Sequence, residues 1–256
     1  MQPPTFALQV PTETVLSHWP EVHACRSDLA LLGSGFSKLP ESVRTPALTQ
    51  MLKNIRKTVL GFDMYRSKQT DSPSLSLIVW ARSSIQHDLL SIDSTLPGDV
   101  NCSHKPKGSP CHSCVLQHDL NRNLYSITRL ATMAFVLHVL FPMPRSAGIH
   151  TEIAARLTQG LDTCYANRLS ETYVNVLQWA TAIGGATADD NQRPLFVERL
   201  IRNAPIQNFS SKQQRDWKHE VDSICSEYLW YPCYDLAREA DAFWQGVWDV
   251  IGTAAQ

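Results

Sequence analysis

The chain has 256 residues and a formal net charge of -1, a length that fits one large domain or two small ones. Hydrophobic residues make up 43% and charged residues only 18%, so the chain can bury a sizeable core but has no dense run of lysine and arginine. Because binding to nucleic acid depends on clustered cations that neutralise phosphates, the composition argues against this chain holding DNA by itself.

The first clear helical pattern begins after residue 45, so residues 1–45 are predicted to be an N-terminal extension ahead of a helical domain at 46–252. Two predicted helices follow, each with apolar residues recurring every three or four positions. Their apolar residues are Leu48, Leu52, Ile55, Val59 and Phe62, and then Leu77, Ile78, Ala81, Ile85 and Leu89. Pro46 marks the start of the first helix, and Ser72–Pro73 mark the start of the second.

Residues 93–118 interrupt this pattern. The stretch contains several residues that break helices, namely Pro97, Gly98, Pro106, Gly108, Ser109 and Pro110. A long loop insertion is therefore predicted at about 93–118, and loops of this length are usually functional or disordered.

Helical patterns return at Asn121 and continue to the end of the chain. The run Thr172–Ile183 is apolar on nearly all sides, which is typical of a central helix, and Gly184–Gly185 are expected to end it. Pro194 opens a short helix, and two further helices begin near Ser211, the first residue of a capping box, and near Asp235. No alternating strand pattern competes, so the sequence predicts an all-α fold: an irregular multi-helix bundle with one long loop insertion.

The loop carries the most specific local signal for chemistry. Its candidate metal ligands are Cys102, His104, Cys111, Cys114 and His118. The Cys-x-x-Cys step places two thiolates where both can bind one tetrahedral zinc ion, and a histidine with a further cysteine or histidine would complete the site. The alternative is a flexible loop that contains these residues by chance, because a complete zinc site usually shows two tight ligand pairs. Zinc is thus the only cofactor that the sequence suggests.

The sequence gives no sign of a membrane protein or a disulfide framework. The longest apolar run, Leu130–Phe141, contains a histidine and is shorter than the ~20 residues that span a bilayer. The first residues, Met1-Gln-Pro-Pro, do not resemble a secretory signal. The chain has an odd number of cysteines, 7, and we expect them to be reduced.

Other groups that could carry catalysis have simpler explanations. The acidic turn at residues 189–191 has no second acidic motif facing it and is predicted to cap the helix at Pro194. His87 and His138 lie in predicted helices, where packing or hydrogen bonding is their usual role. No nucleophile elbow, phosphate-binding glycine loop or paired-histidine metal motif is present. The chain is therefore predicted not to be an enzyme, with a helical enzyme as the least favoured alternative.

The C-terminal third is rich in large aromatic residues: Trp217, Trp230, Phe243, Trp244 and Trp248. These side chains either line a small-molecule pocket or form part of the core, and the core is favoured. If the chain binds a ligand, the expected place is a cavity between Thr172–Ile183 and the last two helices.

Four segments together resemble the fungal-specific transcription factor domain, the regulatory region found downstream of zinc binuclear clusters. In chain order they are Arg82–Ile92, Leu177–Gly185, Arg193–Leu200 and Trp217–Trp248. The resemblance covers roughly residues 45–250. It departs from the family in two respects: these residues include no six-cysteine cluster or basic linker, and the 93–118 insertion has no counterpart.

The resemblance implies a nuclear regulator of transcription whose activity is modulated by a small-molecule effector or by other transcription regulators. Many members of the family control nutrient use or secondary-metabolite gene clusters. It also implies that DNA is contacted only through a module absent from these residues, and that two copies can pair as a homodimer. An alternative is a free-standing helical module that binds a partner or ligand without binding DNA.

Overall fold

The protein is helical throughout the parts that can be described. The computed structural model describes residues 12–92, 112–144, 148–166, 169–202, 211–231 and 234–254. Within these ranges the regular structure consists of α-helices and short 3-10 helices, without a β-strand. The predicted all-α fold is therefore confirmed. None of the helices in these ranges is long and apolar enough to cross a membrane.

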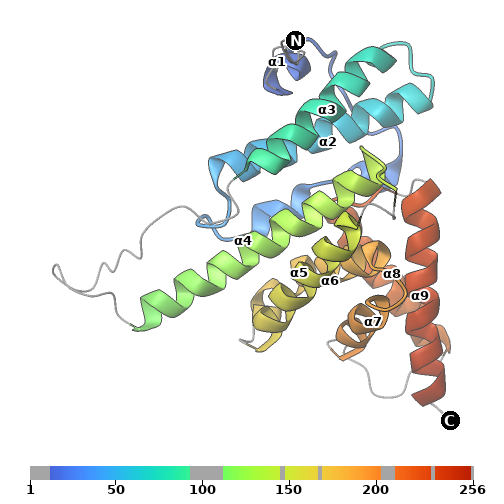
Figure 1. Ribbon diagram of the computed structural model, residues 1–256. Helices are drawn as coiled ribbons and strands as arrows, with labels where there is room; N and C mark the ends of the chain where they lie inside the picture. Colours follow the sequence, from blue (N-terminus) through green and yellow to red (C-terminus); the bar gives the residue numbers. More distant parts are fainter. Residues whose placement is uncertain are drawn as a thin grey trace, which may run out of the picture.

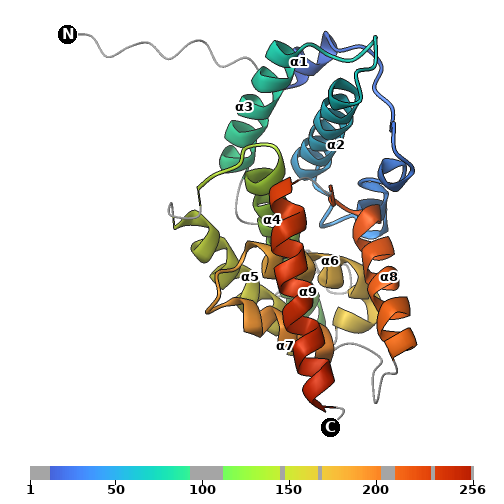
Figure 2. The same ribbon diagram turned by 90° about the vertical axis from the view of Figure 1, so that its right-hand side faces the viewer.

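The first helices form a layer at one end of the molecule (Figures 1 and 2). This layer consists of α1 (Thr12–Ser17), α2 (Pro46–Arg66) and α3 (Leu75–Ser91). Two short 3-10 helices, η1 (Ser27–Leu29) and η2 (Ser34–Lys38), lie between α1 and α2 in the chain, and η2 contacts α6 and α8. Helix α1 packs against both α2 and α3.

Local capping explains where the two long helices of this layer begin. The Thr45 hydroxyl accepts a hydrogen bond from the backbone N–H of Leu48 at 3.2 Å, and Pro46 follows the cap as the first helical residue of α2. At α3 the Ser74 hydroxyl accepts from the N–H of Leu77 at 3.4 Å. Each side chain satisfies one backbone donor that the first turn of a helix leaves without a partner.

Part of the expected N-terminal extension is buried in the main core. Its buried residues include Leu29, Leu32, Phe36, Leu39 and Val43, which are at most 5% exposed and belong to the same core cluster as the later helices. This part of the expected extension is therefore buried against the helices that follow it. Isolated 3-10 turns are too short to show an apolar period, so periodicity alone did not reveal their burial.

The remaining helices pack around α6. They are α4 (His112–Val139), α5 (Ile149–Ala166), α6 (Leu169–Thr187), α7 (Arg193–Arg202), α8 (Ser211–Glu227) and α9 (Tyr234–Ala254). Helix α6 contacts all five of the others, which is why its sequence is apolar on nearly all sides. The predicted central helix is thus confirmed.

The predicted loop is shorter at its C-terminal end than the sequence indicated. Helix α4 begins at His112, not at Asn121, so the stretch from His112 to His118 is helical. Pro110 is the last proline before this helix, and nothing after it prevents the chain from becoming helical. Residues 93–111 lie outside the described part of the chain.

The double glycine does not end the central helix. Helix α6 continues through Gly184 and Gly185 to Thr187. A Cβ atom at Gly184 would lie 2.2 Å from the Phe196 ring, and one at Gly185 would lie 2.3 Å from the Phe243 ring. The two glycines are therefore needed because aromatic rings of α7 and α9 pack directly on the α6 backbone. The prediction that they terminate the helix was wrong.

A side-chain hydrogen bond joins α3 to the C-terminal end of α4. The guanidinium of Arg82 on α3 donates a hydrogen bond from Nε to the carbonyl oxygen of Leu140, just after α4. Burial lowers the pKa of Arg82, since desolvation disfavours the charged form. This contact satisfies one of the carbonyl groups that the end of a helix leaves exposed.

Two cysteines are buried thiols in the helical core. Burial raises the pKa of Cys164 to about 12 and also raises the pKa of Cys225, because the apolar surroundings disfavour the thiolate. In the unfolded chain a cysteine thiol has its ordinary pKa of about 9, so it is largely ionised above that pH. The unfolded state then binds fewer protons than the folded state, so stability falls as the pH rises from about 9 to about 12.

This linkage makes the alkaline stability of the protein a test of thiol burial. Between pH 8 and about pH 10.5 each buried thiol is expected to contribute a loss of about 2 kcal/mol. Urea unfolding at the two pH values measures the loss in free energy of unfolding. We expect this loss to be smaller by about 2 kcal/mol in Cys164→Ala than in the wild type. An equal loss in both proteins would show that the Cys164 thiol is not buried in solution.

Candidate ligand-binding groove

The predicted zinc ligands fall mainly outside the described residues. This applies to Cys102, His104 and Cys111, and the Cys114 side chain is likewise not described although its backbone belongs to α4. His118 lies on the same helix with 15% of its side chain exposed and its Nδ1 atom 3.9 Å from Oδ1 of Asp119. Among the side chains described, no three of His, Cys, Asp or Glu are grouped so as to hold a metal ion. The zinc site therefore stays a prediction.

Metal content tests the zinc hypothesis directly. A structural site predicts about one equivalent of zinc per chain after purification, and its loss in a Cys111→Ser, Cys114→Ser double variant. Cys25→Ser, a change at a half-buried free cysteine far from the loop in sequence, should retain the metal. Less than about half an equivalent in the wild type would remove the hypothesis.

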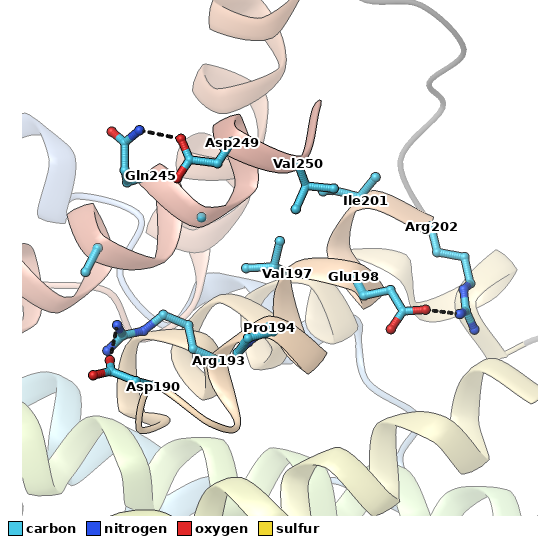
Figure 3. Close-up of a pocket in the computed structure, with 12 residues that line it drawn as sticks. Asp190, Arg193, Pro194, Val197, Glu198, Ile201, Arg202, Gln245, Asp249 and Val250 are labelled. Atoms are coloured by element: carbon cyan, nitrogen blue, oxygen red, sulfur yellow. Dashed lines mark hydrogen bonds and ion pairs between the residues drawn. The ribbon is translucent and has the colours of Figure 1, made fainter. Parts of the chain in front are cut away.

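A groove of about 620 Å³ lies between α7 and α9. Its apolar residues come from both helices: Pro194, Val197 and Ile201 from α7, and Ala242, Gly246 and Val250 from α9. Figure 3 shows Val197, Ile201 and Val250 in the space between the two helices. The volume lies within the ~300–1,000 Å³ typical of small-molecule sites.

Polar side chains surround the apolar part of this groove. The guanidinium of Arg202 forms an ion pair with Glu198 within α7. On α9 the Gln245 side-chain amide donates to Oδ1 of Asp249 at 2.8 Å. The two pairs are drawn in Figure 3. An apolar floor with a small number of polar groups around it is the usual composition of a ligand site.

Arg193 fixes one end of the groove. Its Nη1 donates to Asp190 at 3.0 Å, and its Nη2 donates to Glu239 on α9 at 3.2 Å. It also donates to the carbonyl oxygens of Gly185 and Ala188 at 3.4 and 3.2 Å. The Arg193 and Glu239 side chains are only 15% and 13% exposed. One guanidinium thus joins the end of α6, the start of α7 and the face of α9, so this end of the groove is preformed.

The groove does not lie where the sequence suggested. A cavity was expected between α6 and the last two helices, but α6 and α9 are in direct contact, with the Phe243 ring against Gly185. Trp217 and Trp244 are each 3% exposed and their ring centroids are 5.9 Å apart. The prediction that these aromatics form core is confirmed. The contact between α6 and α9 is thus closed, and the groove of about 620 Å³ lies between α7 and α9. Smaller cavities lie between α8 and α9, beside Trp230 and Trp244, and next to Thr172 at the start of α6.

The acidic turn beside the groove caps a helix, as predicted. Oδ1 of Asp189 accepts hydrogen bonds from the backbone N–H groups of Asn191 and Gln192, both at 3.0 Å. These donors lie directly before α7, which begins at Arg193. The Asp190 side chain is 94% exposed. The geometry is that of a solvated turn with a capping carboxylate.

The buried histidine of α4 packs against a second histidine that the sequence did not single out. The rings of His138 and His150 are both buried, and their centroids are 4.8 Å apart. Nε2 of His150 lies 3.0 Å from the carbonyl oxygen of Met143. His138 is therefore a packed residue in the junction between α4 and α5, as its position in an apolar helix indicated.

Comparison with known proteins gave no relative of this chain. No protein-family model, no curated protein and no solved structure matches it.

The sequence did not predict the groove. The residues that line it lie next to the buried face of each helix, and helical periodicity identifies only the buried face itself. Val197 is buried, but its neighbours Ile201 and Val250 are only partly covered. One local signal was present: Ala242, Gly246 and Val250 recur every four residues along one side of α9. A stripe of small residues indicates that another helix approaches or that space is left open, and only the packing of α7 decides between the two.

Proposed function

We propose that this chain is the regulatory domain of a fungal transcription factor that controls transcription by RNA polymerase II in the nucleus. Its DNA contacts would be made by a module outside these residues. The regulated genes would serve metabolism, for instance a nutrient-use pathway or a secondary-metabolite gene cluster, as the resemblance implies. The all-α fold agrees with this proposal.

The observation that carries the proposal is where the four family-like segments lie. Arg82–Ile92 covers the second half of α3 and the residue after it, Leu177–Gly185 lies in α6, and Arg193–Leu200 lies in α7. Trp217–Trp248 runs from within α8 to within α9. Helix α6 packs against α7, α8 and α9, so three of the four segments form one contiguous unit. Segments of a shared domain are expected to pack together, so this arrangement supports the proposal.

The α7–α9 groove provides a surface through which such a domain could be regulated. A ligand or partner changes activity only if it binds two states of the protein with different affinity. The groove is built from α7 and α9, and both helices contact the central helix. An effector or another transcription regulator bound there would act on elements that touch the core.

A tethering assay tests the proposed function. We expect the chain, fused to an unrelated DNA-binding domain, to change transcription of a reporter gene that carries the matching binding site. The same fusion directed to a reporter without that site should have no effect. No change in transcription in a fungal host, with the fusion protein present in the nucleus, would contradict the proposal.

Matched variants connect the assay to the groove. Val250→Lys places a charge in the groove at a residue that is 47% exposed, and Val79→Lys makes the same change on α3 at 45% exposure. Substitutions at exposed positions usually change stability by no more than about 0.5 kcal/mol. We therefore expect Val250→Lys to reduce the reporter response and Val79→Lys to leave it unchanged. Equal responses of the two variants would exclude the groove as the regulatory surface.

The second candidate is a free-standing module that binds a partner or ligand without any DNA-binding module. Two observations favour this candidate. The net charge of -1 does not suit binding to DNA, and the groove between α7 and α9 can hold a partner or ligand without DNA. Mapping the 5′ end of the native transcript distinguishes the two. An upstream reading frame for a six-cysteine cluster supports the transcription factor, whereas translation that starts at Met1 supports the free-standing module.

A further inference from the structure

A second pocket, of about 350 Å³, lies between η2 and the N-terminal half of α2. Its floor is apolar and is formed by Phe36, Leu39, Leu48 and Leu52, all at most 9% exposed. The volume falls within the ~300–1,000 Å³ range of small-molecule sites. This pocket is separate from the α7–α9 groove and shares no lining residue with it.

The charged residues that line this pocket are all cations. They are Arg44, Lys53 and Arg56, and no acidic residue lines it. In the described part of the chain, none of the three forms an ion pair with a carboxylate, although most other arginines with described contacts do. Three cations around an apolar floor favour an anionic ligand and disfavour a cationic one.

Both guanidinium groups are held in place through a single nitrogen. Nε of Arg44 donates to the carbonyl oxygen of Leu39 at 2.9 Å, and Nε of Arg56 donates to that of Leu32 at 2.7 Å. A guanidinium has five N–H donors, so each keeps further donors for a ligand. Because the groups are already oriented, less conformational entropy is lost when an anion binds.

The start of α2 adds to the positive potential. Leu48 and Thr49 belong to the pocket lining and lie in the first turn of α2, which contains no acidic residue. The N-terminal end of a helix carries a partial positive charge from its aligned peptide dipoles. This effect supports the arginines and the lysine but would not by itself define a site.

We infer that this pocket binds a small organic anion with an apolar body, such as a medium-chain carboxylic acid. The apolar body would cover the floor formed by Phe36, Leu48 and Leu52, and the anionic group would lie against Arg44, Lys53 and Arg56. Charge-assisted hydrogen bonds from guanidinium groups to a carboxylate are among the strongest polar contacts in proteins. The inference concerns the ligand chemistry of the pocket and does not depend on the transcriptional role.

A ligand in this pocket would contact the core through Phe36. The Phe36 ring packs edge-on against Trp179 of α6, with centroids 5.2 Å apart, and against Tyr228 at 5.1 Å. The backbone N–H of Gly33 also donates to the carbonyl oxygen of Tyr228 at 3.0 Å. Binding is therefore expected to stabilise the packing of the N-terminal region on the central helix.

Four probes test the inference on the full chain: decanoate, decanol and decyltrimethylammonium, which share one tail, and acetate, which has the head group alone. Binding is followed by NMR of the Leu48 and Leu52 methyl groups, with each amphiphile below its micelle concentration. We expect decanoate to shift these signals and to bind at least about tenfold more tightly than the other three. Equal binding of decanoate and decanol, tighter binding of the cation, or decanoate shifts confined to other methyl groups would overturn the inference.

Variants at the exposed cations provide the second arm. Arg44→Gln with Lys53→Gln should weaken decanoate binding at least about tenfold, while decanol binding stays the same. Arg156→Gln on α5 is the matched control, because Arg156 is 65% exposed and distant in sequence. Undiminished decanoate binding in the folded double variant would contradict the inference. If that variant does not fold, the comparison of probes on the wild type still decides.

Discussion

Trp179→Ala is expected to remove most of the stability of the fold. The Trp179 ring is fully buried in α6, stacks on Tyr228 with centroids 5.4 Å apart and meets Phe36 edge-on. Removing such a ring costs about 3–5 kcal/mol in transfer and cavity energy. Its Nε1 also donates to the carbonyl oxygen of Leu229 at 3.0 Å; if that oxygen is left without a partner, the loss grows by about 1–3 kcal/mol.

The control for this change is a tryptophan on the surface. Trp80 on α3 is 58% exposed, so Trp80→Ala should change the free energy of unfolding by no more than about 0.5 kcal/mol. Both variants are compared with the wild type by urea unfolding. Similar losses for Trp179→Ala and Trp80→Ala would show that α6 is not the central helix in solution. A charge at Trp244, which is 3% exposed, is likewise expected to destabilise the fold.

Two glycine-to-alanine changes are expected to act in opposite directions. Alanine is a better helix former than glycine by about 1 kcal/mol, so a glycine within a helix is normally improved by this change. At Gly185 the new Cβ atom would lie 2.3 Å from the Phe243 ring, which is fully buried. Overpacking of this kind costs about 1–3 kcal/mol, so Gly185→Ala should be destabilising despite the gain in helix propensity.

Gly246 on α9 is the matched position without such a clash. A Cβ atom there would meet only the Cγ2 atom of Val197, at an ordinary distance of 3.4 Å. Gly246→Ala is therefore expected to stabilise the protein by about 0.5–1 kcal/mol. Thermal unfolding tests both expectations: the melting temperature should fall in Gly185→Ala and rise in Gly246→Ala. If Gly185→Ala were as stable as the wild type, the Phe243 ring of α9 would not pack directly on the α6 backbone in solution.

The candidate sites were less accessible to sequence reasoning than the helices. The predicted zinc ligands follow from spacing within one loop, because a Cys-x-x-Cys step is a local pattern. The cationic pocket combines residues from η2, the segment before α2, and α2 itself. Arg44 and Arg56 are twelve positions apart and have no local pattern in common. Only the packing of the N-terminal region on α2 brings them around the same apolar floor.

The sequence by itself determined that the protein is all-α and which segments become its main helices. The cause is local: the 3.6-residue period and capping residues such as Thr45 act within one or two turns of chain. The burial of Trp244 also followed from its place among the C-terminal aromatics that were predicted to form core. The same reasoning identified α6 as central, since a helix that is apolar on all sides must be covered on all sides.

Only the tertiary structure decided what those helices form together. It showed that Gly184 and Gly185 accept aromatic rings within α6, that Leu29, Phe36 and Val43 are among the core residues, and that the groove lies between α7 and α9. Each depends on contacts between segments far apart in the sequence. A helix pattern specifies which face is buried, but it does not specify which distant side chain meets that face, because the fit of shapes and charges is settled only when the elements pack.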